Sequence, residues 1–115
     1  MVEVVTTDEF AVWYESLSDA HGESVFQAVV RLEQFGTQLP FPHSSALMGS
    51  KYALRELRVK AQGAQIRIAY AFDPARNAVL ILGGAKGGDD RFYEWLIPQS
   101  ERLWEQYLKE QGETP

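Results

Sequence analysis

The hydrophobic positions near the start of the chain follow the period of an amphipathic helix. Counted from Phe10, apolar residues recur at i, i+3, i+4 and i+7 and end at Leu17, which places them on one face of a helix. Thr6 and Glu9 have the spacing of a capping box, so we expect Thr6 to cap this helix. The β-branched run VEVV before it predicts a short first strand.

A second helix is predicted directly after the first. Ser18 is a favourable N-cap, and apolar residues keep helical spacing from Val25 onward. Gly36 offers a C-terminal stop after Phe35. Because the connection between them is so short, the two helices are expected to form an antiparallel hairpin.

Alternation with a period of two marks three strands in the second half of the chain. They cover residues 55–61, 65–72 and 78–82, and the turn sequences QGA and DPARN separate them. Strands joined by such short turns must be antiparallel. These residues therefore predict a three-stranded antiparallel meander.

The same alternation predicts two different faces for this sheet. The large apolar residues of the middle strand share one face, and Arg67 lies on the other face with Ala69 and Ala71. Small residues leave room above a sheet. We therefore expect one apolar face and one open, concave face that carries charge beside alanines.

The C-terminal part is expected to be a loop followed by helices. The stretch GGAKGGDD predicts a glycine-rich loop, and Asp89 or Asp90 is expected to cap a helical stretch that Pro98 interrupts. The segment QSERLWEQYLKE predicts the last helix. The pattern indicates one α+β domain over residues 1–115, with an N-terminal helical hairpin packed on a small antiparallel sheet and a C-terminal helix. We expect the helices to lie on one face of the sheet.

The composition argues against metal and membrane chemistry. Apolar residues make up 45% and aromatic residues 12% of the chain, which is enough for a packed interior. The chain has no basic leader and no run of about 18 apolar residues, and the absence of cysteine fits a reducing cytoplasm. With His21 and His43 as the only histidines, we expect a cytoplasmic protein with no metal site, no cofactor and no membrane contact.

Charge is distributed unevenly along the chain. The net charge is −5, yet residues 51–91 contain eight Lys and Arg against four acids, a net of +4. The remaining residues contain three Lys and Arg against twelve acids, a net of −9. A basic segment inside an acidic protein indicates a polyanion as one partner, although charged faces also occur in proteins that bind none.

The cations of the predicted hairpin gather on its open face. Arg58, Lys60 and Arg67 alternate onto that face, and Lys86 follows the last strand. Arg grips phosphate with a planar fork and Lys offers a point charge, so such a face suits a phosphate-bearing ligand. The alternative interpretation is a solvated strand face on which Glu56 pairs with an arginine.

Several of these segments together resemble one protein family. The stretch LMGSKYALRELRVKAQGAQIRIAYAFDPARNAVLILGGAKGGDDRFY contains a strand ending in E-L-R, a strand with R-I-x-Y-x-F, and an apolar strand ending in a glycine-rich segment with a Lys. It is similar to the core of HigB-like toxins of the RelE/ParE superfamily of type II toxin-antitoxin systems. The resemblance spans residues 47–93, and the preceding helical hairpin fits the family in length and order.

The resemblance implies a ribosome-dependent mRNA endonuclease that inhibits translation and needs no metal. A cognate antitoxin, expected to be a helix-turn-helix protein, would neutralise it, and the pair would bind promoter DNA only through the antitoxin. In such toxins the RNA 2′-OH attacks the adjacent phosphate. The partners implied are therefore the antitoxin, the ribosome and mRNA.

Site residues carry over position by position. Arg58 matches the Arg of the E-L-R strand, Arg67 the Arg of the R-I-x-Y-x-F strand and Lys86 the Lys of the glycine-rich segment. The resemblance implies that these three are catalytic, the arginines as phosphate clamps and Lys86 as an electrostatic or proton-transfer group. The residues predicted to bind RNA are Lys60, Arg55 and Tyr93.

Two other functions are compatible with the sequence. One is a non-enzymatic ParE-like inhibitor that blocks DNA gyrase by protein contact, and the other is a phage-derived binding module that has kept the fold and lost the chemistry. The pI of 5.0 favours the binding module. The predicted sheet carries no His, which reduces the proton-transfer candidates to Lys, Glu56 or Tyr. The clustering of Arg58, Arg67 and Lys86 favours the endonuclease, because a gyrase inhibitor needs no phosphate clamp.

Overall fold

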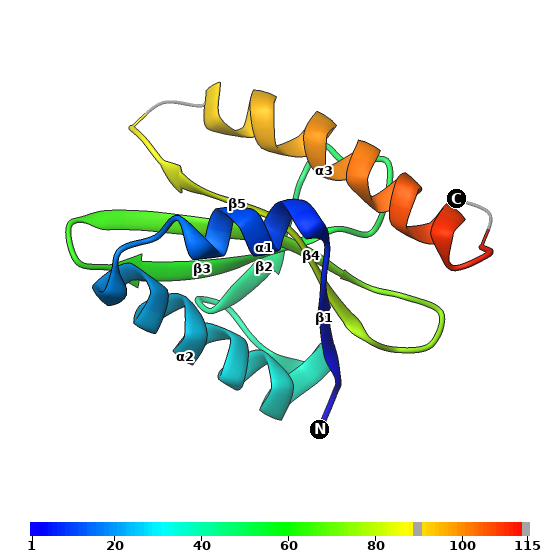
Figure 1. Cartoon of the computed structure of the whole chain (residues 1–115), viewed down its shortest axis with the longest axis horizontal. Helices are drawn as coiled ribbons and strands as arrows, with labels where there is room; N and C mark the ends of the chain where they lie inside the picture. Colours follow the sequence, from blue (N-terminus) through cyan, green and yellow to red (C-terminus); the bar gives the residue numbers. More distant parts are fainter. Residues whose placement is uncertain (89–90, 114–115) are drawn as a thin grey trace.

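The computed structural model describes residues 1–88 and 91–113, so the predicted cap at Asp89 or Asp90 lies outside the described residues. Two helices precede a run of four consecutive strands and a third helix follows it (Figure 1), and this separation of helices from strands confirms the predicted α+β class. The elements are β1 (Val4–Thr6), α1 (Asp8–Glu15), α2 (Asp19–Phe35), the short 3-10 turn η1 (Gly36–Gln38), β2 (Ser44–Ala46), β3 (Arg55–Ala61), β4 (Ala64–Phe72), β5 (Ala78–Lys86) and α3 (Arg91–Glu110).

The sheet is mixed. Its strand order is β1-β5-β4-β3-β2, with β2 to β5 antiparallel to their neighbours and β1 parallel to β5. The meander of β3, β4 and β5 confirms the prediction from short turns. The prediction of a wholly antiparallel sheet is wrong at β1, because a strand separated from its partner by a long connection is not constrained by any turn. The strand β2 was not predicted, since its sequence is short and follows two prolines.

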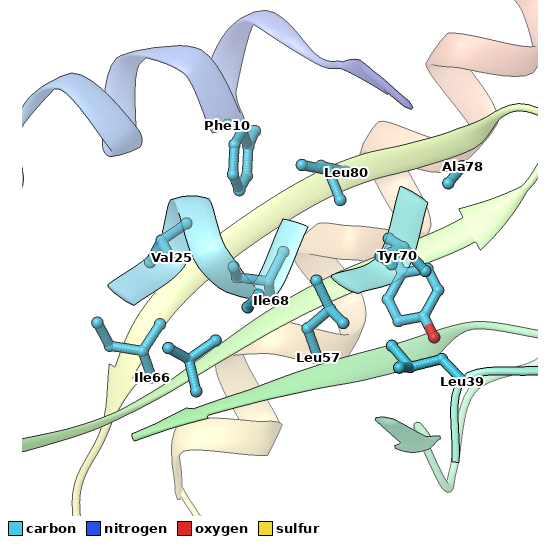
Figure 2. Close-up of a cluster of buried hydrophobic side chains, with 12 residues drawn as sticks. Phe10, Val25, Leu39, Leu57, Ile66, Ile68, Tyr70, Ala78 and Leu80 are labelled. Atoms are coloured by element: carbon cyan, nitrogen blue, oxygen red, sulfur yellow. The ribbon is translucent and has the colours of Figure 1, made fainter. Parts of the chain in front are cut away.

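Helices cover both faces of the sheet, which corrects the expected arrangement on one face. Side chains of α1 and α2 pack against one face in a core around Phe10, Val25, Leu57, Ile68 and Tyr70 (Figure 2). The other face carries the core of α3, whose buried side chains pack against small and branched residues of β4 and β5. They are Leu96, Leu103, Trp104 and Leu108 of α3, with Ala69, Ala71, Val79 and Ile81 of the sheet.

The alanines therefore mark a helix-packing surface and not an open one. Ala69 is fully buried and Ala71 is 3% exposed, both beneath α3. A side chain of one carbon lets a helix lie close to a sheet. The space above the alanines, which was predicted to be an open concavity, is therefore filled by α3. The part of this face that α3 leaves open is the end of the hairpin that carries the cations.

The N-terminal caps are partly as predicted. Thr7, not Thr6, caps α1, and its hydroxyl accepts a hydrogen bond from the N–H of Phe10 at 3.0 Å. Thr6 ends β1 instead, where it pairs with Leu80. The α2 helix begins and ends as expected, with Ser18 as its N-cap and Gly36 after Phe35.

The helix α3 continues through Pro98, where an interruption was predicted. Pro98 has no N–H to bond the carbonyl of Glu94, and both residues are exposed, so water can reach that carbonyl. Leu96 and Ser100 on either side are buried against the sheet, and this packing outweighs the lost hydrogen bond. None of the helices in the described ranges combines the length and apolar content required for a membrane span.

Strand β5 is longer than predicted, because Gly83, Gly84 and Lys86 belong to it and not to a loop. A Cβ on Gly83 would come within 2.4 Å of the Trp13 ring on one face. A Cβ on Gly84 would come within 3.0 Å of Trp95 on the other. The two glycines therefore let helices approach the strand from both sides.

Tyr107 fastens α3 to the turn between β4 and β5. Its hydroxyl donates to Asp73 Oδ2 at 2.7 Å, and Asn77 donates to the same carboxylate through its backbone N–H and its side-chain amide. Burial, aided by the hydrogen bond to Asp73, raises the pKa of Tyr107 to about 12. Burial alone would raise the pKa of Asp73, but the bonds from Tyr107 and Asn77 outweigh it and lower that pKa.

We expect Tyr107→Phe to lower the free energy of unfolding by about 1–2 kcal/mol at neutral pH. Because the pKa of Tyr107 is raised on folding from 10.0 to about 12, its contribution is complete below pH 10 and disappears as the pH rises toward 12. Urea denaturation of both chains along a pH series measures this. The difference in free energy of unfolding between the two chains should shrink above about pH 10. A difference that stays constant over the pH series would contradict the role given to the Tyr107 hydroxyl.

Candidate nucleic-acid interface

Four cations share one face at one end of the three long strands. In the register of the sheet Arg58 lies opposite Arg67, Lys60 opposite Gln65, and Gln65 opposite Lys86. Directly opposed residues of antiparallel strands point to the same side, so the alternation rule was right for this group. We call Arg58, Lys60, Arg67 and Lys86 the cation face.

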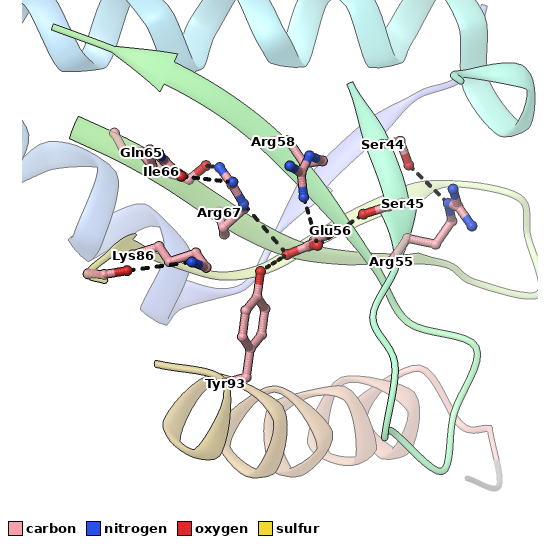
Figure 3. A network of polar contacts seen from close by, with 11 residues as sticks. Ser44, Ser45, Arg55, Glu56, Arg58, Gln65, Ile66, Arg67, Lys86 and Tyr93 are labelled. Carbon is pink, nitrogen blue, oxygen red and sulfur yellow. Dashed lines mark hydrogen bonds and ion pairs between the residues drawn. The ribbon is translucent and has the colours of Figure 1, made fainter. Parts of the chain in front are cut away.

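Glu56 lies next to the two arginines of the cation face (Figure 3) and is only 5% exposed. Its Oε1 accepts a hydrogen bond from the Tyr93 hydroxyl at 2.8 Å, and its Oε2 accepts one from Ser45 Oγ at 2.9 Å. Arg58 Nη1 lies 3.5 Å from Oε2, and Arg67 Nε lies 3.9 Å from Oε1. Both carboxylate oxygens are therefore occupied, and Glu56 holds two like-charged guanidinium groups near each other.

The two arginines differ in how much of them a ligand can reach. The side chain of Arg58 is 30% exposed, and its guanidinium lies 5.3 Å from the centre of the Phe41 ring. Arg67 is 6% exposed and donates to the Ile66 carbonyl and to Gln65 Oε1. Arg58 can contact a phosphate directly. Arg67 is buried, and the low dielectric around it strengthens the effect of its charge.

Tyr93 reaches the site from the first turns of α3. It is half-buried, and its hydroxyl is engaged by Glu56. Burial and the carboxylate of Glu56 raise the pKa of Tyr93, while Arg67 acts against them. The phenol therefore stays protonated as a donor at neutral pH, and this contact positions Glu56 between the arginines.

The two lysines are less constrained than the arginines. Lys60 is exposed, and within the described part of the chain it has no hydrogen-bond or ion-pair partner. Lys86 is the last residue of β5, where a loop position was predicted, and its ammonium lies 3.5 Å from the Gly87 carbonyl. Both lysines are free to turn toward a ligand.

Arg55, which was predicted to bind RNA, lies apart from the cation face. It precedes Glu56 on β3, so its side chain points to the opposite side of the sheet. Its Nε donates to Ser44 Oγ at 3.0 Å (Figure 3). Ser44 Oγ in turn shares a hydrogen bond with the Tyr70 hydroxyl. The structure brings Arg58, Lys60, Arg67, Lys86 and Tyr93 together and leaves Arg55 outside.

A groove opens beside the cation face at the free edge of β3. The short strand β2 pairs only with residues 55–57 of β3, and the N–H of Arg58 bonds to the His43 carbonyl, so the edge of β3 is uncovered after Arg58. This groove, which we call the edge groove, has a volume of about 510 Å³. It is lined by Ser24, Gln27, Ala28 and Arg31 of α2, by Pro42 and His43, and by Arg58, Val59, Lys60, Gln65 and Arg67 of the hairpin.

The edge groove contains two residues that the sequence pattern did not reveal. Arg31 is the single Lys or Arg of α2, whose other charged residues are acidic, and it lines the groove. His43 lines the groove too, and its carbonyl accepts from the N–H of Arg58 at 2.9 Å. Only the packing of α2 and the loop against β3 brings them there.

A second hollow continues from the first along the end of the hairpin. It has a volume of about 740 Å³ and is lined by Lys60, Ala61, Gly63, Ala64, Gln65, Ala85, Lys86, Gly87 and Gly88. It shares Lys60 and Gln65 with the edge groove. Together the two hollows form a track lined by cations from one helix and three strands, which suits an extended polyanion.

The comparisons with known proteins point to one family. The family described as "Phage derived protein Gp49-like" matches residues 12–105, a span that contains the whole cation face. Two relatives come from Mycobacterium tuberculosis. "Putative toxin HigB2" is 31% identical over 93% of this chain, and "Putative toxin HigB3" is 36% identical over 91% of it.

The two relatives differ in length. The chain covers 55% of HigB2, about half of that protein, and 92% of HigB3. The similarity to HigB3 therefore extends over nearly the full length of both chains. The chain belongs to the Gp49-like family and is a homologue of these HigB proteins, which confirms its resemblance to HigB-like members of the RelE/ParE superfamily.

Proposed function

We propose that this chain is the toxin of a toxin-antitoxin system and acts as a ribosome-dependent mRNA endonuclease. The observation that carries the proposal is the cation face, with Glu56 holding two arginines beside a groove, in a chain homologous to proteins named as HigB toxins. A cognate antitoxin, a helix-turn-helix protein in this proposal, covers the cation face or contacts the helices and silences the activity.

The proposed reaction is an internal transesterification of RNA. The 2′-hydroxyl gives its proton to water as its oxygen forms a bond to the adjacent phosphorus, and the bond from phosphorus to the 5′-oxygen breaks. The products carry a 2′,3′-cyclic phosphate and a 5′-hydroxyl. Arg58 and Arg67 stabilise the extra negative charge on the phosphorane, and the ammonium of Lys86 supplies the proton that the 5′-oxygen takes up. The ribosome holds the 2′-oxygen in line, which removes part of the barrier.

The test is a translation reaction followed by mapping of mRNA 5′ ends. The wild-type chain is compared with an Arg67→Ala, Lys86→Ala chain, each with and without ribosomes. We expect new 5′ ends only with ribosomes and only from the wild-type chain, because the variant lacks two of the groups that act on the phosphorane and the leaving oxygen. Arg102→Ala, an exposed cation of α3, is the matched control and should cleave like the wild type.

The same reaction separates the alternatives. Intact mRNA together with inhibited supercoiling by DNA gyrase would replace the proposal with a ParE-like inhibitor. Intact mRNA and unaffected gyrase would replace it with a binding module that has lost the chemistry. Cleavage that persists in the double variant would contradict the roles given to Arg67 and Lys86.

A further inference from the structure

We infer that the edge groove is an RNA-binding subsite, in which Arg31 contacts a backbone phosphate while a nucleobase stacks on Phe41, which adjoins the lining residues Pro42 and Arg58. The inference rests on the proposed function, because it extends the substrate path from the cation face around the free edge of β3. None of the residues carried over from the family resemblance lies on α2 or on the loop before β2.

The charge of the groove supports this occupant. Arg31 and Lys60 line it, and neither has a hydrogen-bond or ion-pair partner among the described residues. The cation face itself is partly neutralised by Glu56, whereas the residues that line the edge groove in the described part of the chain include no acid. Unpaired cations in a hollow raise the local concentration of an anionic ligand.

Phe41 provides the second, independent observation. It is 70% exposed, although a phenylalanine gains by burial, and its ring lies 5.3 Å from the guanidinium of Arg58. The adjoining Pro42 and His43 line the groove. An exposed ring next to a row of cations is the combination by which proteins bind single-stranded nucleic acids, with a base on the ring and the backbone on the cations.

The test uses the full chain and a short fluorescein-labelled single-stranded RNA, with binding measured by fluorescence anisotropy along a salt series. We expect Phe41→Ala to weaken binding by about 5- to 100-fold without changing the salt dependence, since stacking carries no charge. Phe41→Tyr should bind like the wild type. Arg31→Gln should weaken binding and reduce the slope of log K against log salt by about 0.7, the value for one phosphate contact on a single strand.

Matched controls are available in the same chain. Phe26→Ala removes another exposed aromatic side chain, 54% exposed on α2, and Arg102→Gln removes a cation on α3. Both should bind like the wild type. If Phe41→Ala lowers the salt slope instead, the ring acts by placing Arg58, and the stacking inference is wrong.

The remaining outcomes separate this inference from the proposed function. If the wild-type chain binds no RNA, or if both groove variants bind like the wild type, the subsite is refuted even where mRNA cleavage proceeds. If the groove variants lose RNA but the wild-type chain cleaves no mRNA, the subsite stands and the endonuclease does not. If the groove variants bind RNA like the wild type but no longer bind the antitoxin, the RNA subsite is refuted. The groove would then be a binding site for an acidic segment of the antitoxin.

Discussion

Replacing Arg67 with glutamine in a chain that already carries Glu56→Gln is expected to reduce ribosome-dependent mRNA cleavage by about 100-fold or more. The Glu56→Gln chain alone should retain cleavage within about tenfold, because a neutral amide still bonds to Tyr93 and Ser45. The reason for the double variant is the position of Glu56. Removing Arg67 alone leaves a carboxylate that is 5% exposed with less positive charge near it, and breaking such a pair costs about 3–5 kcal/mol of stability.

The measurement is the initial rate at which new mRNA ends appear, at equal concentrations of folded protein established by urea denaturation. Lys60→Gln, which removes an exposed cation from the same face, is the control for net charge and should reduce the rate less than the loss of Arg67. If Glu56→Gln alone abolishes cleavage in a stable chain, Glu56 takes part in the proton transfer. That result would refute its assignment as a positioning residue.

Gly83→Ala is expected to lower the free energy of unfolding by about 2–3 kcal/mol. Three ring carbons of Trp13 lie within 2.7 Å of the place that the new Cβ would occupy. Trp13 belongs to α1, and its ring packs against the ring of Phe10 from the same helix, with the two centroids 5.4 Å apart. The Trp13 ring therefore cannot move without disturbing the core between α1 and the sheet. The loss therefore comes from overpacking in the folded state.

Urea denaturation with linear extrapolation measures this change. Gly87→Ala is the matched control, since no atom lies within 4 Å of its Cβ position, and it should alter stability by no more than about 0.5 kcal/mol. In a double-mutant cycle, Trp13→Leu should cost less stability in the Gly83→Ala chain than in the wild type. If Gly83→Ala and Gly87→Ala change the free energy of unfolding equally, the close contact with Trp13 is not the cause of the loss of stability.

The candidate site was predictable to the extent that strand alternation determines it. Arg58, Lys60 and Arg67 share a face because side chains of a strand alternate, and the short turns between residues 55 and 86 bring their strands together. Lys86 joined them although its place on a strand was not foreseen. Arg55, which was predicted to bind RNA, lies on the other side of β3, as its odd spacing from Arg58 requires.

The sequence by itself determined the elements whose causes are local. The N-cap Ser18 and the stop at Gly36 bound α2, and the meander follows from turn residues between apolar strands, because capping and turn chemistry act within a few residues. The tertiary structure decided everything that joins distant residues. It buried Ala69 beneath α3, and it brought Tyr93 to Glu56 across 37 positions of sequence.

The set of residues that lines the edge groove was also decided by the tertiary structure. Arg31 reaches the edge groove because α2 packs on β3, and Phe41 reaches Arg58 because the chain returns to pair β2 with β3. Sequence periodicity reports which face of an element is apolar, but not which other element covers it. That choice depends on the shapes of both surfaces, and here it converted a predicted open face into a helix-covered one with the cations at its uncovered end.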